Sequence, residues 1–182
     1  NPSVFTFIDV EDDEYKDFLI QAYTSLPNTL LKEKALSRRL SDPLHFALVM
    51  EAVGEVAATF AGIDYTTEAV LFAAQQIIGL KEGITTISSI GLCDISNFEG
   101  SEGSLLAITD SAVAVNPTAE ELANIAISAC DTMRELLDWE PRCALISYST
   151  LGSGQGMLVD KVVEAKKIAN EKRPDLAIDG EF

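Results

Sequence analysis

Apolar residues recur at helical spacing near the start of the chain. In residues 12–25 (DDEYKDFLIQAYTS), Tyr15, Phe18, Leu19 and Tyr23 stand three or four positions apart. This spacing gathers the apolar side chains on one face, so the segment is predicted to form an amphipathic helix. Further helices, bounded by Pro, Thr or Gly, are predicted over residues 29–40, 43–53, 68–80, 119–137 and 157–171.

Runs rich in β-branched and apolar residues separate these helices. Residues 56–63 (VAATFAGI) are predicted to form a buried strand, and residues 85–95 and 105–109 to form neighbouring strands joined by a turn at 97–103. Two more strands are predicted, over residues 142–149 and 176–182. Because strands alternate with helices of about ten or more residues, the pattern predicts an α/β fold with a largely parallel sheet.

The length suits one ordinary domain or two small lobes around a hinge. We predict that residues 1–84 belong to a first lobe, with a helical start, one strand and a helix. Residues 85–182 are predicted to form a second αβα lobe, with a glycine-rich loop at 147–156.

The charge of the chain excludes several classes of partner. The 182 residues include 29 acidic and 13 basic side chains, so the formal charge is 13 − 29 = −16. Phosphate backbones and anionic membranes are held by clusters of Lys and Arg, so neither a nucleic acid nor a membrane is expected as a partner. No apolar run approaches the roughly 18 residues that suggest a spanning helix. The first residues resemble neither a basic leader nor a signal peptide, and the absence of an initial Met suggests a trimmed or excised chain.

The cysteine and histidine content argues against a metal site. Cys93, Cys130 and Cys143 are widely spaced and form no CxxC pair, so neither a disulfide framework nor a zinc site is expected. Free cysteines in apolar surroundings are typical of a cytoplasmic protein, which is the predicted location. His45, the only histidine, lies on an apolar helix and is expected to pack there.

The clearest candidate site is the segment SYSTLGSGQG between a predicted strand and a predicted helix. Glycines allow backbone amides to converge, and the following helix adds its positive N-terminal end, an arrangement typical of anion sites. The spacing matches neither a P-loop nor a dinucleotide fingerprint. A turn without any ligand remains an alternative.

Five of the 13 basic residues lie on or just after the helix that follows this loop: Lys161, Lys166, Lys167, Lys172 and Arg173. Their charge favours an anionic ligand nearby. Alternatively, these residues only complement the dipole at the C-terminal end of their helix.

Residues 143–181 (CALISYSTLGSGQG and the helix and strand after it) closely resemble the phosphate acetyltransferase and phosphate butyryltransferase (phosphotransacylase) family. Three other stretches are similar to family segments: SDPLHFALVMEAVGEV, AGIDYTTEAV and ITDSAVAVNPTAEELANIAISACDT. The resemblance extends over roughly residues 40–182, the central portion of the family's sequence.

This resemblance implies the transfer of a short acyl group between coenzyme A and phosphate, with coenzyme A as a substrate and with no cofactor or metal. It implies a three-layer αβα fold like that of isocitrate and isopropylmalate dehydrogenases, incomplete in this chain, and a homodimer. The implied phosphate contacts are Ser147, Ser149, Thr150, Gly152, Ser153 and Gly154, with Thr66 and Thr67 across a cleft. Asp110 and Asp179, which follow strands, are further candidates.

The sequence also departs from the family. The Ser-Arg pair and the aspartate that the family uses in catalysis have no counterpart in these 182 residues, and Phe72 stands where the family has a functional arginine. An apolar ring cannot pair with phosphate as a guanidinium does. The chain alone is therefore expected to show little turnover, and the alternative function is a non-catalytic module that binds acyl-CoA or acyl phosphate.

Overall fold

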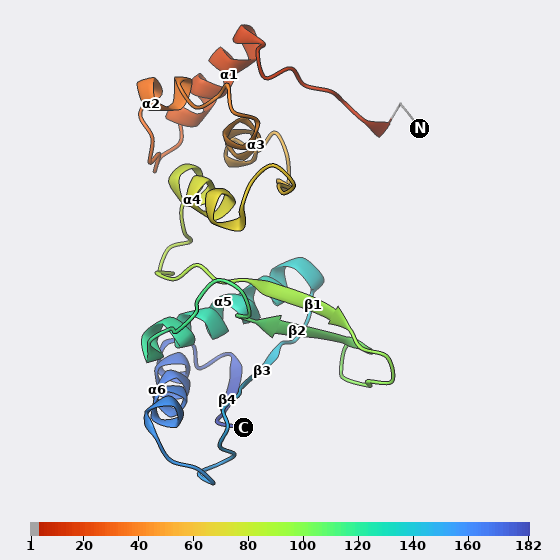
Figure 1. Ribbon diagram of the computed structural model, residues 1–182, viewed down its shortest axis with the longest axis vertical. Coiled ribbons are helices and arrows are strands. Elements are labelled where there is room, and N and C mark those ends of the chain that lie inside the picture. Colours follow the sequence, from red (N-terminus) through yellow and green to blue (C-terminus); the bar gives the residue numbers. More distant parts are fainter. Residues whose placement is uncertain (1–3) are drawn as a thin grey trace. The chain divides into compact units, whose positions relative to one another are not determined.

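The computed structural model describes residues 4–182. These residues form two compact units, which divide the chain between Leu80 and Lys81 (Figure 1). Helices and small sheets occur together, which confirms the α/β class. The assignment of residues 1–84 and 85–182 to two lobes of a larger fold stays a prediction, and residues 1–3 of that range lie outside the described part.

The first unit is helical. It contains α1 (Asp13–Thr24), α2 (Glu33–Ser37), α3 (Pro43–Ala52) and α4 (Thr67–Ile77). Asp12, Asp42 and Thr66 precede three of these helices, and the side chain of each accepts a hydrogen bond from the amide three residues later. Such caps satisfy amides that the helix itself leaves unpaired, so the local sequence sets where α1, α3 and α4 begin.

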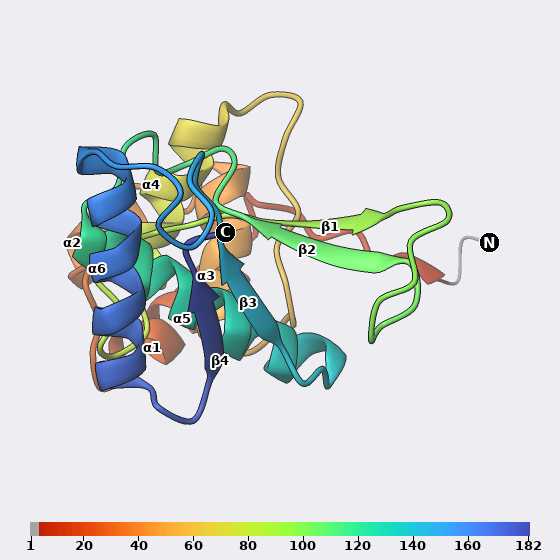
Figure 2. The same cartoon turned by 90° about the horizontal axis from the view of Figure 1, so that it is seen from below.

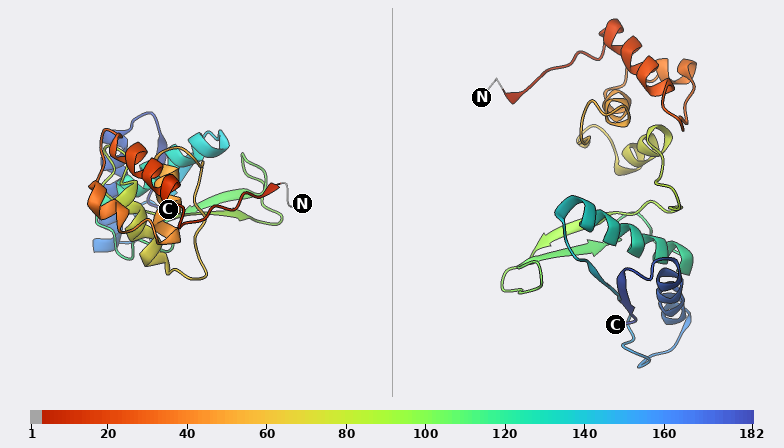
Figure 3. Two further views of the ribbon diagram at one scale, coloured as in Figure 1. Left: turned by 90° about the horizontal axis from the view of Figure 1, so that it is seen from above. Right: turned by 180° about the vertical axis from the view of Figure 1, so that it is seen from behind.

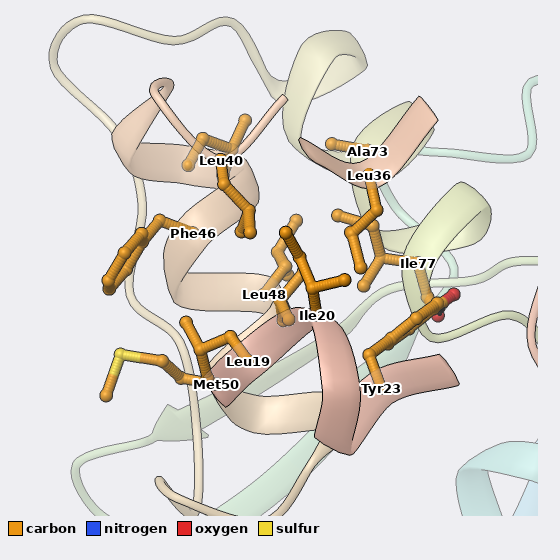
Figure 4. Packing of buried hydrophobic residues seen from close by; sticks show 12 residues of the cluster. Leu19, Ile20, Tyr23, Leu36, Leu40, Phe46, Leu48, Met50, Ala73 and Ile77 are labelled. Carbon is orange, nitrogen blue, oxygen red and sulfur yellow. Dashed lines mark hydrogen bonds between the residues drawn. The ribbon is translucent and has the colours of Figure 1, made fainter. Parts of the chain in front are cut away.

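Apolar side chains from all four helices form the core of this unit (Figure 4). Leu36 and Leu40 anchor the short α2 and the turn after it, and both are fully buried. Tyr23 is also buried, and its hydroxyl donates to the carbonyl oxygen of Ile77 at 2.8 Å, which ties α1 to the end of α4. Burial of these side chains, rather than helix propensity, stabilises so short a helix as α2.

The strand expected at residues 56–63 does not form, and this part of the prediction is wrong. No strand occurs anywhere among residues 4–80. Phe60 and Ile63 are almost wholly exposed instead of buried. A strand requires a hydrogen-bonded neighbour, and this helical unit supplies none, so an apolar run alone cannot produce one.

The second unit combines two helices with two small sheets. The elements are β1 (Ile90–Asp94), β2 (Leu105–Thr109), α5 (Ala119–Leu137), β3 (Arg142–Leu145), α6 (Met157–Lys172) and β4 (Ala177–Gly180). β1 and β2 pair antiparallel across the expected turn, and β3 and β4 pair parallel (Figure 2).

Small residues allow α5 and α6 to pack closely (Figure 3). Ala123 and Ala126 on α5 and Ala165 and Ala169 on α6 are buried in one cluster with Leu145 of β3. A reciprocal capping box at the start of α5, between Thr118 and Glu121, fixes that helix end. The helices therefore hold β3 and β4 in place, and the glycine-rich segment leaves the end of β3.

Candidate functional site

Residues 147–156 form a compact loop between β3 and α6, next to the residues that follow β4. The loop amides are already engaged within the protein. The amide of Ser147 donates to the carbonyl oxygen of Phe182 at 2.8 Å, and that of Leu151 to the carbonyl oxygen of Glu181 at 3.0 Å. The amide of Gly154 donates to the Ser149 hydroxyl at 2.9 Å. The loop is thus a folded turn with internal partners for most of its donors.

The carboxylate of Glu181 occupies the interior of this loop. Its Oε1 atom accepts hydrogen bonds from the Gly152 amide at 2.7 Å and from the Ser149 hydroxyl at 3.1 Å. Its Oε2 atom lies 3.2 Å from the Ser147 hydroxyl. Hydrogen bonds, first that from the Gly152 amide and then those from the two serines, lower the pKa of Glu181, so this side chain is an anion in the folded protein.

The sequence predicts that these amides converge on an external anion. The loop does converge on an anion, but the anion is a side chain of the same protein. Ser147, Ser149, Gly152 and Gly154 each donate within the loop and its neighbours. Their role as direct phosphate contacts stays a prediction, and the geometry does not favour it.

Thr150 and Ser153 are different, because both are exposed and their hydroxyl groups remain able to donate. The Ser153 oxygen accepts a hydrogen bond from the Thr150 amide at 2.8 Å, which leaves its own proton for an outside acceptor. The loop thus presents two exposed hydroxyl donors, which define its outer rim, in the segment that leads into α6.

The basic residues on α6 have partners within the protein. Lys166 pairs with Asp179 at 3.2 Å, Lys172 with Glu120 at 3.0 Å and Arg173 with Asp131 at 2.7 Å. The remaining two contact a side-chain amide or a neighbouring carboxylate: Lys161 with Asn116 and Lys167 with Glu164. Each of these five basic side chains thus has a partner within the protein.

Asp179 lies on the exposed face of β4. Its carboxylate accepts from the Gly180 amide at 2.8 Å and pairs with Lys166, and both contacts lower its pKa. It lines an open hollow of about 570 Å³ together with Lys166, Cys143 and Phe182. The glycine-rich loop does not line this hollow, so the two candidates Asp179 and Thr150 do not converge on it.

Asp110 follows β2 and holds the turn after it. Its carboxylate accepts hydrogen bonds from the amides of Ala112 and Val113 at 3.1 Å and of Ala114 at 2.6 Å, and from the Ser89 hydroxyl. Partial burial opposes ionisation, but these hydrogen bonds outweigh it and lower the pKa of Asp110 to about 2. Both carboxylate oxygens are engaged in this turn, so the structure supports a local role for Asp110.

Asp110→Asn is expected to destabilise the unit of residues 81–182 by about 1–2 kcal/mol at neutral pH. A carboxyl whose pKa is lowered by folding stabilises the folded state above its unfolded pKa, about 3.9, and that contribution disappears as the pH falls towards about 2. Urea unfolding at a series of pH values should therefore show a difference from wild type that shrinks between these limits. Glu99→Gln, at an exposed carboxylate in the β1–β2 turn, is the control; a difference independent of pH would contradict the prediction.

Thr66 and Thr67 lie in the first unit, at the start of α4, where the Thr66 hydroxyl caps the helix. Their role as ligand contacts stays a prediction. Phe72, on the same helix, is 61% exposed, so this apolar ring faces outward where the resemblance places an arginine.

Asp42 makes contacts that the sequence did not predict. It caps α3, contacts the His45 ring and accepts a hydrogen bond from the Tyr65 hydroxyl. Partial burial opposes ionisation, but hydrogen bonds from Tyr65 and His45 lower the pKa of Asp42. His45 is half-buried on this helix, as a packing role requires, and it has a partner for its ring.

The three cysteines are free thiols. Cys130 on α5 is buried, as expected, and shares a hydrogen bond with Cys143 on β3, which raises the pKa of Cys130 and lowers that of Cys143. Among residues 4–182, no three His, Cys, Asp or Glu side chains are grouped so that they could hold a metal ion. Within the same range, no helix has the length and apolar character needed to cross a membrane.

Comparisons with known proteins agree on one family. Residues 1–182 match the family model described as "Phosphate acetyl/butaryl transferase". The chain is 41% identical to a phosphate acetyltransferase of Clostridium acetobutylicum over 145 residues. This match covers 80% of the chain and 44% of that protein. It is 42% identical over 147 residues to a phosphate acetyltransferase of Treponema pallidum, covering 79% of the chain and 44% of that protein.

Solved structures give the same relationship. A phosphotransacetylase from Streptococcus pyogenes superposes with a TM-score of 0.73 at 30% identity, covering 97% of the chain and 50% of that structure. The EutD phosphotransacetylase from Staphylococcus aureus superposes with a TM-score of 0.75 at 26% identity, covering the whole chain and 54% of that structure. The chain spans about half the length of the relatives it matches.

Proposed function

The chain belongs to the phosphate acetyl/butaryl transferase family, and on this premise we propose that the protein transfers a short acyl group between coenzyme A and inorganic phosphate. The match of the family model to residues 1–182 is the observation that carries the proposal. The relatives named above as phosphate acetyltransferases support acetyl as the acyl group.

In the proposed reaction, the thiol sulfur of coenzyme A attacks the carbonyl carbon of the acyl phosphate. The bond from that carbon to the phosphate oxygen breaks, phosphate leaves, and a base takes the thiol proton. The reverse direction forms acyl phosphate. Catalysis of this kind depends on positioning and on stabilising the charge that develops on oxygen, so neither a metal nor a cofactor is invoked.

Within this chain, the loop at 147–156 is the proposed phosphate-binding element. The exposed hydroxyls of Thr150 and Ser153 are the donors proposed to meet a phosphate oxygen, in the loop that leads into the N-terminal end of α6. The base and the Ser-Arg pair that the resemblance implies have no counterpart among these residues, so no catalytic side chain is assigned here.

We extend the proposal to the finer features of the family resemblance. The two units are proposed to be parts of a three-layer αβα fold like that of isocitrate dehydrogenase, in which β3 and β4 belong to a larger parallel sheet. A homodimer located in the cytoplasm, without a nucleic acid or membrane as partner, completes this proposal. The acidic composition is consistent with those exclusions.

A non-catalytic module that binds acyl-CoA or acyl phosphate is the second candidate function. One observation favours it: Phe72 is exposed where the resemblance places a phosphate-binding arginine. Such a module would keep the rim of the loop and lose the cationic contact that stabilises the leaving phosphate.

An assay with acetyl phosphate separates the two candidates. The complete product of the gene is expected to release phosphate from acetyl phosphate only when coenzyme A is present, whereas the 182 residues alone are expected to show little or no turnover. Reactions without coenzyme A are the control. If the complete product binds acetyl phosphate but shows no turnover that depends on coenzyme A, the binding module is the better description.

A further inference from the structure

Glu181 is an unusual residue in this fold. Among residues 4–182, the buried polar or charged side chains are Asn124, Ser149 and Glu181, and Glu181 is the charged one of the three, with 3% of its surface exposed. Charged groups are rarely buried unless their hydrogen-bonding capacity is satisfied. Two of these three buried side chains, Ser149 and Glu181, contact each other in the glycine-rich loop.

The surroundings of this carboxylate are those of an oxyanion site. Three donors reach it: the Gly152 amide and the hydroxyls of Ser149 and Ser147, at 2.7, 3.1 and 3.2 Å. The main chain is held as well, because the carbonyl oxygen of Glu181 accepts from the Leu151 amide at 3.0 Å. Glu181 therefore joins the first half of the loop to the end of β4 by both its side chain and its backbone.

We infer that Glu181 is a positioning residue, whose carboxylate takes the place of an internal anion and holds the loop so that Thr150 and Ser153 face a phosphate group of the substrate. This inference rests on the proposed function. In this arrangement, the phosphate binds at the outer rim of the loop and does not displace Glu181, because displacement would break the hydrogen bonds that the Glu181 carboxylate accepts and would bury a larger anion in its place.

The inference assigns different roles to neighbouring serines. Ser147 and Ser149 hold Glu181 and do not touch the ligand, whereas Ser153 keeps a proton free to donate outward. Loss of Glu181 should loosen the loop and weaken phosphate binding, while the KM for coenzyme A should change much less.

Glu181→Gln, made in the complete gene product, tests this inference. It keeps the shape of the side chain but removes the charge, and it places an amide donor among three donors. We expect KM for phosphate to rise roughly tenfold to a hundredfold, with kcat and KM for coenzyme A changed less than about threefold. Exchange of the loop amides with deuterium, followed by mass spectrometry of residues 147–156, should become faster.

Three further variants sharpen the test. Glu181→Asp keeps the charge and should recover part of the affinity for phosphate. Ser147→Ala removes one contact to Oε2, and it should give a smaller increase in KM for phosphate even if Glu181→Gln fails to fold. Glu164→Gln is the matched control, because this exposed side chain on α6 pairs with Lys167 at 3.7 Å, away from the loop.

The results for wild type and variants separate the role of Glu181 from the proposed reaction. A wild-type enzyme whose KM for phosphate is unchanged in Glu181→Gln and Ser147→Ala overturns the role of Glu181 and leaves the proposed function standing. A wild-type protein that neither turns over acetyl phosphate nor binds inorganic phosphate by calorimetry overturns both. A wild-type protein that binds phosphate without turnover, and loses that binding in Glu181→Gln, supports the inference and contradicts the proposed reaction.

Discussion

Gly180→Ala is expected to lower the free energy of unfolding of residues 81–182 by about 2–4 kcal/mol. Gly180 lies opposite Leu145 in the parallel pair of β4 and β3. A Cβ atom at this position would stand 2.6 Å from the carbonyl oxygen and 2.9 Å from the Cβ atom of Leu145, which are contacts that backbone atoms cannot relieve by rotation. The φ angle of 156° adds strain for any residue other than glycine.

The clash can be separated from backbone strain with a second glycine. Gly103, in the turn between β1 and β2, has a φ angle of 67°, and an added Cβ atom would meet nothing within 4 Å. Gly103→Ala should therefore cost about 1 kcal/mol from strain alone. Urea unfolding of both variants measures the difference, and equal losses would contradict the role assigned to the contact with Leu145.

Gly180→Ala should also affect the loop. The added atom would push β4 away from β3 and carry the next residue, Glu181, with it. The loop amides of residues 147–156 are then expected to exchange faster, as we also expect when the charge of Glu181 is removed. An unchanged exchange rate in this segment, despite a lower stability, would show that the loop holds Glu181 independently of the strand pairing.

Leu36→Ala is expected to destabilise the helical unit by about 3 kcal/mol. The α2 helix has only five residues, too few to be stable by its own hydrogen bonds. Leu36 is fully buried among side chains of the other helices, so its truncation removes apolar contacts and leaves a cavity (Figure 4). α2 should then lose protection from deuterium exchange before the rest of the unit.

Lys34→Ala, at an exposed position of the same helix, is the matched control and should change stability by less than about 0.5 kcal/mol. Thermal or urea unfolding gives the comparison. A loss below about 1 kcal/mol in Leu36→Ala would mean that neighbouring side chains fill the cavity, and that α2 contributes little to this core.

The helices could be predicted from the sequence because their signals are local. Asp42 and Pro43 mark the start of α3, and Thr118 with Glu121 marks that of α5. The spacing of Leu19 and Tyr23 also predicted which face of α1 is buried. Each of these signals acts within one or two helical turns, so neighbouring residues suffice to read it.

The error at residues 56–63 has the opposite cause. Val56 to Ile63 has the composition of a buried strand, yet strand formation depends on a partner far away in the sequence. Residues 4–80 contain no such partner strand, and the composition of residues 56–63 could not reveal its absence.

Glu181 was missed for a related reason. The sequence drew attention to Asp179, because an acidic residue after a strand is a common ligand position. Successive side chains of a strand point to opposite faces. In β4, Ile178 and Gly180 are buried, so Asp179 between them is exposed. The contact of Glu181 with Gly152 spans 29 positions, and no local pattern predicts it.

The span of this contact has a consequence for biosynthesis. A ribosome makes the glycine-rich segment before it adds Glu181, so the amide of Gly152 can only bind water until the carboxylate has been incorporated and β4 has joined β3. The loop therefore cannot complete these contacts before Glu181 has been made. A shortened translation product that stops before Glu181 would contain every glycine of the loop and still lack its shape.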